Sequence, residues 1–223
     1  MKTDMYQYEK YLWEDGFDLV AGIDEAGRGP LAGPVVAAAV ILPKSNDGYP
    51  IIPGLRDSKQ LSKKQREILY QEILRKAIAW RAYAVSAKEI DRLNILRSTQ
   101  KAMIFCVQKL SRQPEYVLID AVTLDLKQMP SVALIKGDQR SATIAAASII
   151  AKVTRDRIMD VLHRRFPQYC FNHNRGYATQ KHLSALRQYG PCPFHRFSFA
   201  PVRNSSASQN CSLFGISEYA RPD

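Results

Sequence analysis

Short apolar stretches alternate with helical patterns along the chain. Residues 18–26 are predicted to be a strand with a short apolar core, and residues 33–42 are continuously apolar up to Pro43, as a strand buried on both faces is. From Gln60 to Ile78 apolar residues recur at helical spacing, with Ser58 as a candidate cap. Further strands are predicted at 80–85, 116–120 and 131–136, and further helices at 86–93, 95–110, 141–166 and 179–188. This alternation predicts an α/β domain with a central sheet.

Length and composition fit one globular domain with short ends. The 223 residues are 46% hydrophobic and 24% charged, which excludes disordered, collagen-like and disulfide-scaffold proteins. We expect an N-terminal extension over 1–16, one domain with a helical C-terminal part over 17–203, and a flexible tail over 204–223. The longest apolar run is about half a membrane span, the first residues hold no apolar signal core, and four cysteines are scattered. These features favour the cytoplasm over a membrane or secretion.

Basic residues are concentrated in one stretch of the chain. Lys and Arg number 32 against 21 Asp and Glu, which gives a net charge of +11. Between Gln139 and Arg203, eleven Lys and Arg stand against only two acids, so this basic stretch carries +9. Such a stretch is typical of proteins that bind a polyanion, with a merely solvated surface as the plainer alternative.

Acidic residues nevertheless stand where predicted strands end. Asp24 and Glu25 close the first strand, Asp120 closes a later one, and Asp138 follows the last. Strand ends form the crevice in which open α/β sheets bind ligands. Carboxylates gathered there would repel one another and a phosphate backbone. A pair of Mg²⁺ ions removes this conflict, because Mg²⁺ prefers oxygen ligands and two such ions stabilise both oxygens of an in-line phosphoryl transfer.

Two points stay open for these acids. Each one alone is more often a turn former or helix cap than a metal ligand, and capping is a particular alternative for Asp138, which precedes the predicted helix at 141–166. Asp24 and Glu25 are neighbours, and neighbours on a regular strand point to opposite faces. They share a site only if the strand ends or bulges there, which the nearby glycines allow.

A glycine-rich segment follows the first acids and reads Asp24-Glu-Ala-Gly-Arg-Gly-Pro-Leu-Ala-Gly33. Glycines let backbone amides approach a ligand, and Arg28 adds a guanidinium between two of them, so the segment is suited to grip a phosphate or a sugar hydroxyl. It matches neither a P-loop nor a dinucleotide fingerprint. A plain turn between two strands is the alternative.

This segment is the first of several ordered signatures. It extends as Gly22-Ile-Asp-Glu-Ala-Gly-Arg-Gly-Pro-Leu-Ala-Gly-Pro-Val-Val36. The others are Asp57-Ser-Lys-Gln-Leu-Ser62, Val117-Leu-Ile-Asp120, Lys136-Gly-Asp138, Ala145-Ala-Ala-Ser-Ile-Ile-Ala-Lys-Val-Thr-Arg-Asp156, Gly176-Tyr-Ala-Thr179 and His195-Arg-Phe-Ser-Phe199. Together they resemble bacterial ribonuclease HII, the type 2 ribonuclease H, over about residues 17–203.

The resemblance implies a ribonuclease H-like fold, with a central mixed β-sheet flanked by helices and a helical C-terminal region. It also implies cleavage, dependent on two Mg²⁺ or Mn²⁺ ions, of the RNA strand of RNA–DNA hybrids and of DNA on the 5′ side of single embedded ribonucleotides. The products would carry 3′-OH and 5′-phosphate ends. By matching position, the catalytic and metal-binding carboxylates would be Asp24, Glu25, Asp120 and Asp138.

The resemblance further assigns residues that read the substrate. Gly27, Arg28 and Gly29 would contact the ribose 2′-OH, the group that separates RNA from DNA. Tyr177 would pack on the deoxyribose next to the ribonucleotide, although a tyrosine packed in the core is the alternative. Beside these, Lys59 and Lys152 are candidates for phosphate contacts, with solvated lysines as the alternative.

Other motifs compete with this interpretation. Two Cys-x-x-His pairs, Cys170 with His173 and Cys192 with His195, have the spacing of a structural zinc site. Asp156 resembles a fifth metal ligand, but its position between Arg155 and Arg157 favours an ion pair that orients those arginines. Cys106, in an apolar helix, is predicted to be a core residue.

Two other functions remain open, and so does the role of the tail. A different two-metal nuclease of the same fold class would cut all-DNA junctions, and a non-catalytic nucleic-acid binder would use only the basic stretch. In the tail, Asn210-Cys-Ser-Leu-Phe214 resembles peptides that dock on the bacterial sliding clamp, although Gln209 lies one place early and a frayed terminus is the alternative. We expect a monomer.

Overall fold

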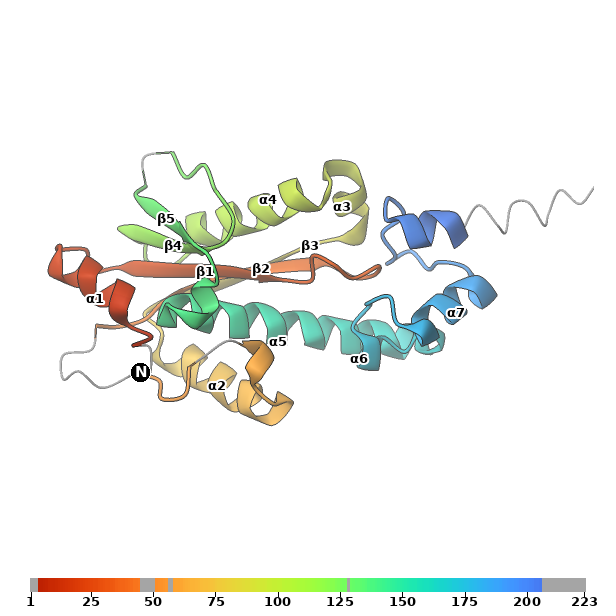
Figure 1. Ribbon diagram of the computed structural model, residues 1–223, viewed down its shortest axis with the longest axis horizontal. Helices are drawn as coiled ribbons and strands as arrows, with labels where there is room; N and C mark the ends of the chain where they lie inside the picture. Colours follow the sequence, from red (N-terminus) through yellow and green to blue (C-terminus); the bar gives the residue numbers. More distant parts are fainter. Residues whose placement is uncertain (1–3, 45–50, 56–57, 128, 206–223) are drawn as a thin grey trace, which may run out of the picture.

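A five-stranded mixed sheet forms the centre of the computed structural model, which describes residues 4–44, 51–55, 58–127 and 129–205 (Figure 1). The strands are β1 (Val20–Ala26), β2 (Val35–Ile41), β3 (Ala79–Val85), β4 (Tyr116–Asp120) and β5 (Ser131–Leu134). Their order in the sheet is β3-β2-β1-β4-β5. β2 is antiparallel to β1 and β3, whereas β4 runs parallel to β1 and β5. The predicted mixed sheet is confirmed.

Helices cover both faces of this sheet. They are α1 (Gln7–Glu14), α2 (Lys63–Lys76), α3 (Ala87–Leu93), α4 (Ile95–Gln108), α5 (Ala142–Arg165), α6 (Phe171–Asn174) and α7 (Gln180–Tyr189), with short 3₁₀ turns η1 (Ser58–Gln60), η2 (Gly137–Gln139) and η3 (Pro167–Tyr169). Figure 1 shows α3 and α4 on one side of the sheet and α2 and α5 on the other. The elements α6 and α7 follow the end of α5 and form the predicted helical C-terminal region.

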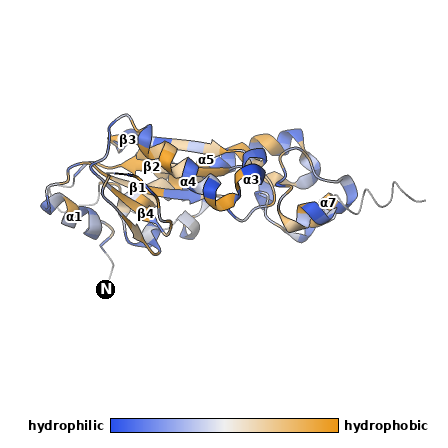
Figure 2. Cartoon of the chain, turned by 90° about the horizontal axis from the view of Figure 1, so that it is seen from above, coloured by the Kyte–Doolittle hydropathy of each residue, from blue (hydrophilic) through white to orange (hydrophobic). Residues whose placement is uncertain are grey.

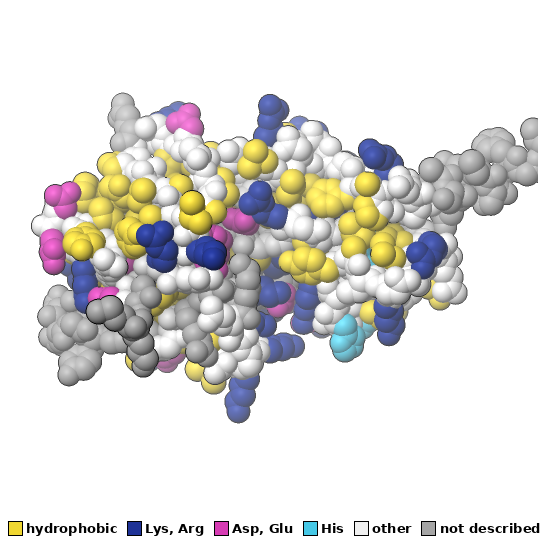
Figure 3. Space-filling view, in the orientation of Figure 1, with side chains coloured by type: hydrophobic (Ala, Val, Ile, Leu, Met, Phe, Trp, Pro, Cys, Tyr) yellow, Lys and Arg dark blue, Asp and Glu magenta, His cyan; other side chains and the backbone are white. Residues whose placement is uncertain are grey.

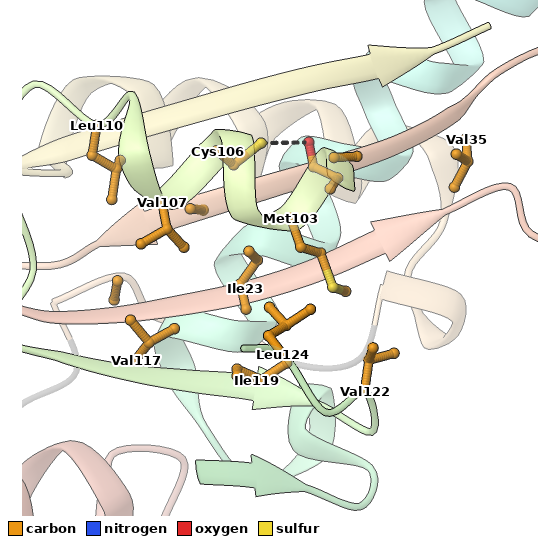
Figure 4. Close-up of a cluster of buried hydrophobic side chains, with 14 of the residues drawn as sticks. Ile23, Val35, Met103, Cys106, Val107, Leu110, Val117, Ile119, Val122 and Leu124 are labelled. Atoms are coloured by element: carbon orange, nitrogen blue, oxygen red, sulfur yellow. Dashed lines mark hydrogen bonds between the residues drawn. The ribbon is translucent and has the colours of Figure 1, made fainter. Parts of the chain in front are cut away.

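The face of the sheet under α4 is a dry apolar layer. Ile23 of β1 packs there against Met103 and Cys106 of α4, all fully buried (Figure 4). The Cys106 thiol donates to the carbonyl oxygen of Ala37 at 3.4 Å, and burial raises the pKa of this thiol to about 12. The prediction that Cys106 is a core residue is therefore confirmed.

The opposite face holds α5 close against the sheet. A side chain at Gly22 would lie 2.1 Å from the carbonyl carbon of Thr143, so glycine is required where the start of α5 crosses β1. The small residues Ala145, Ala146 and Ala147 continue this approach and are completely buried. Figure 2 shows the apolar character of β1, β2 and β4, the strands between α4 in front and α5 behind.

A separate apolar cluster joins the C-terminal region to the rest of the molecule. Phe171 and Leu186 pack with Met159 near the end of α5 and with Leu31 from the glycine-rich segment. The loop after β1 is thus part of the C-terminal core. The C-terminal helices therefore fix the position of the glycine-rich segment.

The local predictions differ from the structure in three places. Ser58 begins η1, and the cap of α2 is Ser62, whose side chain forms a capping box with Gln65. The strand β5 lies at the sheet edge, so three of its four residues are exposed rather than buried. The helix α1 was not predicted. In the described part of the chain, no helix is both long and apolar enough to cross a membrane.

Candidate active site

Strand register brings two of the predicted acids together. The parallel ladder between β1 and β4 ends at the pair Ile23–Ile119, so Asp24 and Asp120 are the next residues on adjacent strands. Parallel neighbours at the same level point to the same face. Asp120 is anchored there by Oδ1, which accepts the backbone N–H of Gly137 at 2.7 Å. The two carboxylates therefore stand side by side at the carboxyl end of the sheet.

Glu25 reaches the same cavity from a regular strand. The antiparallel ladder between β1 and β2 continues without a register change through Ala26. We expected β1 to end or bulge if Asp24 and Glu25 share a site. This expectation holds only on the edge of β1 that faces β4, because β4 stops at Asp120. Past that point the edge of β1 is open, and Asp24 and Glu25 both line one cavity.

The cavity has a volume of about 240 Å³ and is lined by acids, glycines and basic side chains. Its lining includes Asp24, Glu25, Gly27, Arg28, Gly29, Ser58, Asp120, Ser148, Lys152, Arg155 and Tyr177. Most of the predicted site residues thus lie together. Figure 3 shows a small group of acidic side chains near the centre of this face, beside Lys and Arg side chains.

Burial and electrostatic repulsion act together on the acidic end of the cavity. Asp24 is only 5% exposed. Burial, followed by repulsion from Glu25 and Asp120, raises the pKa of Asp24 well above its ordinary value. Hydrogen bonds from the Ser148 hydroxyl and the Glu25 backbone N–H act in the opposite direction.

This donor set fits a hard divalent cation. The donors are carboxylate oxygens, and a cation between them would relieve the repulsion that raises the pKa of Asp24. Among the residues that the structure describes, no three Asp, Glu, His or Cys side chains already converge into a metal-binding group. Mg²⁺ keeps several waters and needs only one or two protein carboxylates, so the loosely gathered set still suits it.

Asp138 lies in η2, outside the cavity lining. It is 3% exposed, and it follows Lys136, whose backbone is left-handed with φ 55°. The adjoining Gly137 N–H holds Asp120, so the turn of Asp138 is tied to the site. The alternative that Asp138 caps α5 is wrong, because the capping residue is Ser141, whose hydroxyl accepts the N–H of Ile144 at 3.2 Å.

Two buried arginines shape the glycine-rich segment. Gly27 has a φ of +95°, and a side chain there would lie 2.0 Å from Nε of Arg155. Arg155 donates to the carbonyls of Pro34 and Ala32 at 3.0 and 3.2 Å. Arg196 donates to three further carbonyl oxygens, those of Gly27, Arg28 and Gly33, at 2.6 to 3.0 Å. With its carbonyls taken up by these guanidiniums, the segment is held rigidly beside the acids.

The remaining predicted contacts are distributed around the cavity. Tyr177 is half exposed, so the alternative of a core tyrosine is wrong, and its ring would lie 3.7 Å from a side chain at Gly29. The Arg28 guanidinium lies 3.4 Å from Oε1 of Glu25. Lys152 pairs with Asp156 at 2.7 Å, and burial lowers the pKa of this lysine. The side chain of Lys59 lies outside the described residues, as does the clamp-like peptide at 210–214.

Sequence reasoning misjudged several basic residues. The eleven Lys and Arg of the basic stretch are not one exposed surface, because Arg155 and Arg196 are buried. Asp156 does not orient Arg155 or Arg157. It pairs with Lys152 and with Arg175, whose Nε lies 3.8 Å away, whereas Arg157 pairs with Glu67. Arg196 lies inside the signature His195-Arg-Phe-Ser-Phe199, which marked it as a candidate for a specific role. That role, holding the carbonyls of the glycine-rich segment, is visible only in the folded structure.

The two Cys-x-x-His pairs do not assemble a zinc site. His195 accepts the backbone N–H of Cys192 at 3.0 Å through Nδ1, and its Nε2 lies 3.0 Å from Nε2 of His182. His173 is exposed at the end of α6. These side chains serve the C-terminal core rather than a metal.

The fold and the acidic cavity define a type 2 ribonuclease H. The crystal structure of ribonuclease H2 from Pyrococcus horikoshii OT3 has a TM-score of 0.75 and 28% identity, and the match covers 86% of this chain and 99% of that chain. The ribonuclease HII in the PCNA complex from Archaeoglobus fulgidus has a TM-score of 0.69 and 27% identity, with 81% and 95% of the chains covered. The predicted ribonuclease H-like fold is confirmed.

Sequence similarity then selects the family. The ribonuclease HII family model matches residues 21–202. A ribonuclease HII from Geobacillus sp. (strain WCH70) is 54% identical over 200 residues, which are 90% of this chain and 70% of that protein. The chain belongs to the ribonuclease HII family. It is therefore a ribonuclease H-type hydrolase, and membership supports cleavage of RNA–DNA hybrids, which decides against the all-DNA nuclease and the non-catalytic binder.

Proposed function

We propose that this enzyme cuts duplex DNA on the 5′ side of a single embedded ribonucleotide, as well as the RNA strand of hybrids, and leaves 3′-OH and 5′-phosphate ends. The observation that supports this most is the single cavity that Asp24, Glu25 and Asp120 line together with Gly27–Gly29 and Tyr177. The acids have the chemistry for phosphodiester hydrolysis. The glycine-rich segment and Tyr177 have the groups to sense one sugar hydroxyl.

The chain's own residues have distinct tasks in this reaction. The rigid glycine-rich segment receives the ribose 2′-OH through the Gly27–Gly29 backbone and the Arg28 side chain. Tyr177 takes the neighbouring deoxyribose against its exposed ring. Lys152 and Lys59 neutralise phosphate charge near the scissile bond, and Asp156 holds the Lys152 ammonium in place. These contacts orient the phosphodiester over the acids before water attacks.

Asp24, Glu25, Asp120 and Asp138 would hold Mg²⁺ or Mn²⁺, two ions in the reacting complex. The chemistry that such ions would supply at these carboxylates is activation of the attacking water and stabilisation of charge on the leaving 3′ oxygen. The acid set suits them because its carboxylates repel one another in a buried site. Asp120 is oriented by the Gly137 N–H, and Asp24 by the Ser148 hydroxyl.

The direct test is a DNA duplex that carries one ribonucleotide. We expect metal-dependent cleavage on its 5′ side, with no cut in the matched all-DNA duplex or in an all-DNA four-way junction. A continuous RNA–DNA hybrid is the positive control, and EDTA abolishes both reactions. If the hybrid is cut and the single-ribonucleotide duplex is not, the proposed cleavage at a single embedded ribonucleotide is wrong.

We further propose a cytoplasmic monomer whose tail contacts the sliding clamp. The clamp-like peptide at 210–214 and the PCNA complex of the Archaeoglobus fulgidus ribonuclease HII support the contact. The free thiols of Cys106, Cys170 and Cys192 are consistent with a reducing compartment. Light scattering measures the mass of the chain, and the clamp affinity of the full chain is compared with that of a chain that ends at Arg203. Equal affinities contradict the clamp contact.

A further inference from the structure

Two histidines lie against each other in the C-terminal core, behind the exposed ring of Tyr177. His182 of α7 and His195 are both completely buried. Their Nε2 atoms are 3.0 Å apart, and the rings of Tyr169 and Phe171 pack around them. Neither histidine lines the cavity.

The outer partners of the two rings fix where the protons are. The backbone N–H of Cys192 can only donate, so Nδ1 of His195, 3.0 Å away, carries a lone pair. The carbonyl oxygen of Tyr177 can only accept, so Nδ1 of His182, 2.8 Å away, carries a proton. If both rings are neutral, only one hydrogen bond between them is possible: Nε2–H of His195 donates to Nε2 of His182. Every hydrogen bond in the series from Cys192 to Tyr177 points the same way.

A second proton on either ring breaks this series. On Nε2 of His182 the added proton would face the Nε2–H of His195, so two donors would meet with no acceptor between them. On Nδ1 of His195 it would take the place of the lone pair that accepts the Cys192 N–H, and the new N–H would have to donate to the Cys192 carbonyl oxygen at the longer distance of 3.3 Å. The titratable groups that face the pair are the Tyr169 hydroxyl, which donates to the Gly190 carbonyl, and the Cys192 thiol, and burial raises the pKa of both. Burial lowers the pKa of His195 to about 4 and that of His182 as well.

The series ends on the loop that presents Tyr177 to the cavity. The same loop holds the glycine-rich segment, because the Leu31 N–H donates to the Gly176 carbonyl at 2.8 Å. At the other end, His195 pairs with Ala32 in an isolated β-bridge. The histidine pair therefore stands between the two parts of the cavity that contact the sugars.

We propose that His182 and His195 are positioning residues: as a neutral pair with ordered protons, they fix Tyr177 relative to the glycine-rich segment and so set the preference for a single ribonucleotide in DNA over a continuous hybrid. This inference rests on the function proposed above. Tyr177 makes the sugar contact, and the pair determines where the backbone of Tyr177 lies.

Nuclear magnetic resonance on the ¹⁵N-labelled full chain tests the pair without any activity measurement. Long-range ¹H–¹⁵N spectra at pH 7 are expected to show His182 protonated on Nδ1 and His195 protonated on Nε2. The His195 ring should remain neutral until the pH falls to about 4, and the His182 ring should remain neutral below the ordinary histidine pKa of about 6.5. The opposite tautomers, or titration of either buried ring near pH 6.5, overturn the proposal.

Selectivity tests the positioning role. His182→Leu removes the donor to Tyr177, and we expect the ratio of kcat/KM for the single-ribonucleotide duplex to kcat/KM for the hybrid to fall roughly fivefold to tenfold, the value of one hydrogen bond. His182→Asn keeps an N–H donor near that carbonyl and should restore most of the ratio. His173→Leu, on the exposed end of α6, is the matched control and should leave the ratio unchanged.

The outcomes separate this proposal from the function on which it rests. An equal loss of both activities in folded His182→Leu, or no rescue by His182→Asn, contradicts the positioning role. If the wild-type enzyme does not cut at a single ribonucleotide, the proposed function fails, and the selectivity role fails with it, while the spectra still report whether the ordered pair exists. If His182→Leu does not fold, the His182→Asn ratio and the spectra of the wild-type chain decide.

Discussion

The guanidinium of Arg196 is completely buried and donates from Nη2 to the carbonyl oxygen of Gly27 at 2.6 Å, although 169 residues separate the two in sequence. The same side chain also binds the carbonyls of Arg28 and Gly33. A single planar fork thus holds both ends of the glycine-rich segment. No other side chain type has enough donors in one plane for this task.

Arg196→Lys should therefore impair the enzyme despite its conserved charge. An ammonium cannot reach all three carbonyls, and each buried acceptor left unsatisfied costs about 1–3 kcal/mol. We expect a lower Tm and a fall of roughly tenfold or more in kcat/KM. Thermal unfolding and cleavage kinetics check this, with Arg187→Lys on the exposed face of α7 as the control. Wild-type kinetics and stability in Arg196→Lys contradict the holding role.

Asp24→Asn should abolish cleavage and spare substrate binding. The carboxylate is the metal donor in the proposed reaction, whereas the basic residues supply affinity, so we expect less than about 1% of wild-type activity with little change in Kd. Asp120→Asn should behave in the same way. Cleavage within about tenfold of wild type in either variant removes the metal assignment.

The same substitution should stabilise the protein in EDTA. The folded state raises the pKa of Asp24, so above the ordinary pKa the charged carboxylate destabilises the fold relative to the unfolded chain. An amide carries no charge, and the Tm of Asp24→Asn at pH 8 should exceed that of the wild type by a few degrees. Added Mg²⁺ should raise the wild-type Tm and leave the variant almost unchanged. A lower Tm in Asp24→Asn without metal would contradict the repulsion described here.

Tyr177→Ala should change substrate choice more than it changes overall activity. A flat ring against a deoxyribose leaves little room for an added hydroxyl, so its loss should reduce kcat/KM on the single-ribonucleotide duplex more than on a continuous hybrid. Tyr189→Ala removes a ring of similar exposure from α7 and serves as the control. An equal drop on both substrates, with unchanged circular dichroism, means that Tyr177 does not read the junction.

Substrate binding should weaken steeply with salt. Among the exposed residues of the basic stretch are Arg164 and Arg165 at the end of α5. Each phosphate contact contributes roughly −0.9 to the slope of log K against log salt, so the double alanine variant should have a slope shallower by about one to two units. Arg112→Ala, outside the stretch, should keep the wild-type slope. An unchanged slope in the double variant excludes this face from the nucleic-acid interface.

Stability should fall in mild acid because of the histidine pair. The folded pKa of His195 is about 4, below its ordinary value of 6.5, so the unfolded chain takes up the proton first as the pH falls. The stability present above pH 6.5 is then lost toward pH 4, by roughly 3 kcal/mol. Urea unfolding between pH 7 and pH 4 measures this loss. His195→Asn should show a smaller loss over the same window, and an identical pH dependence contradicts the shift.

The sequence by itself determined most of the elements and indicated the candidate site residues. The run from Gly33 to Pro43 is continuously apolar because β2 is buried on both faces, and a strand of that kind needs no distant information to be recognised. The acids at the strand ends could also be recognised from the local pattern, because a polar residue that ends an apolar run marks the end of the strand. Ordered signatures then indicated the family.

The tertiary structure decided which of these residues meet. Asp24 lies beside Asp120 because the parallel register of β1 and β4 stops one residue before both, and register depends on the whole sheet. Arg196 reaches Gly27 because the C-terminal region packs back onto the glycine-rich segment, and His195 reaches His182 because the chain folds back on α7 within that region. A local pattern records whether a residue is buried. Its hydrogen-bond partner across the fold depends on how distant elements pack, and that packing is fixed only when the entire chain is folded.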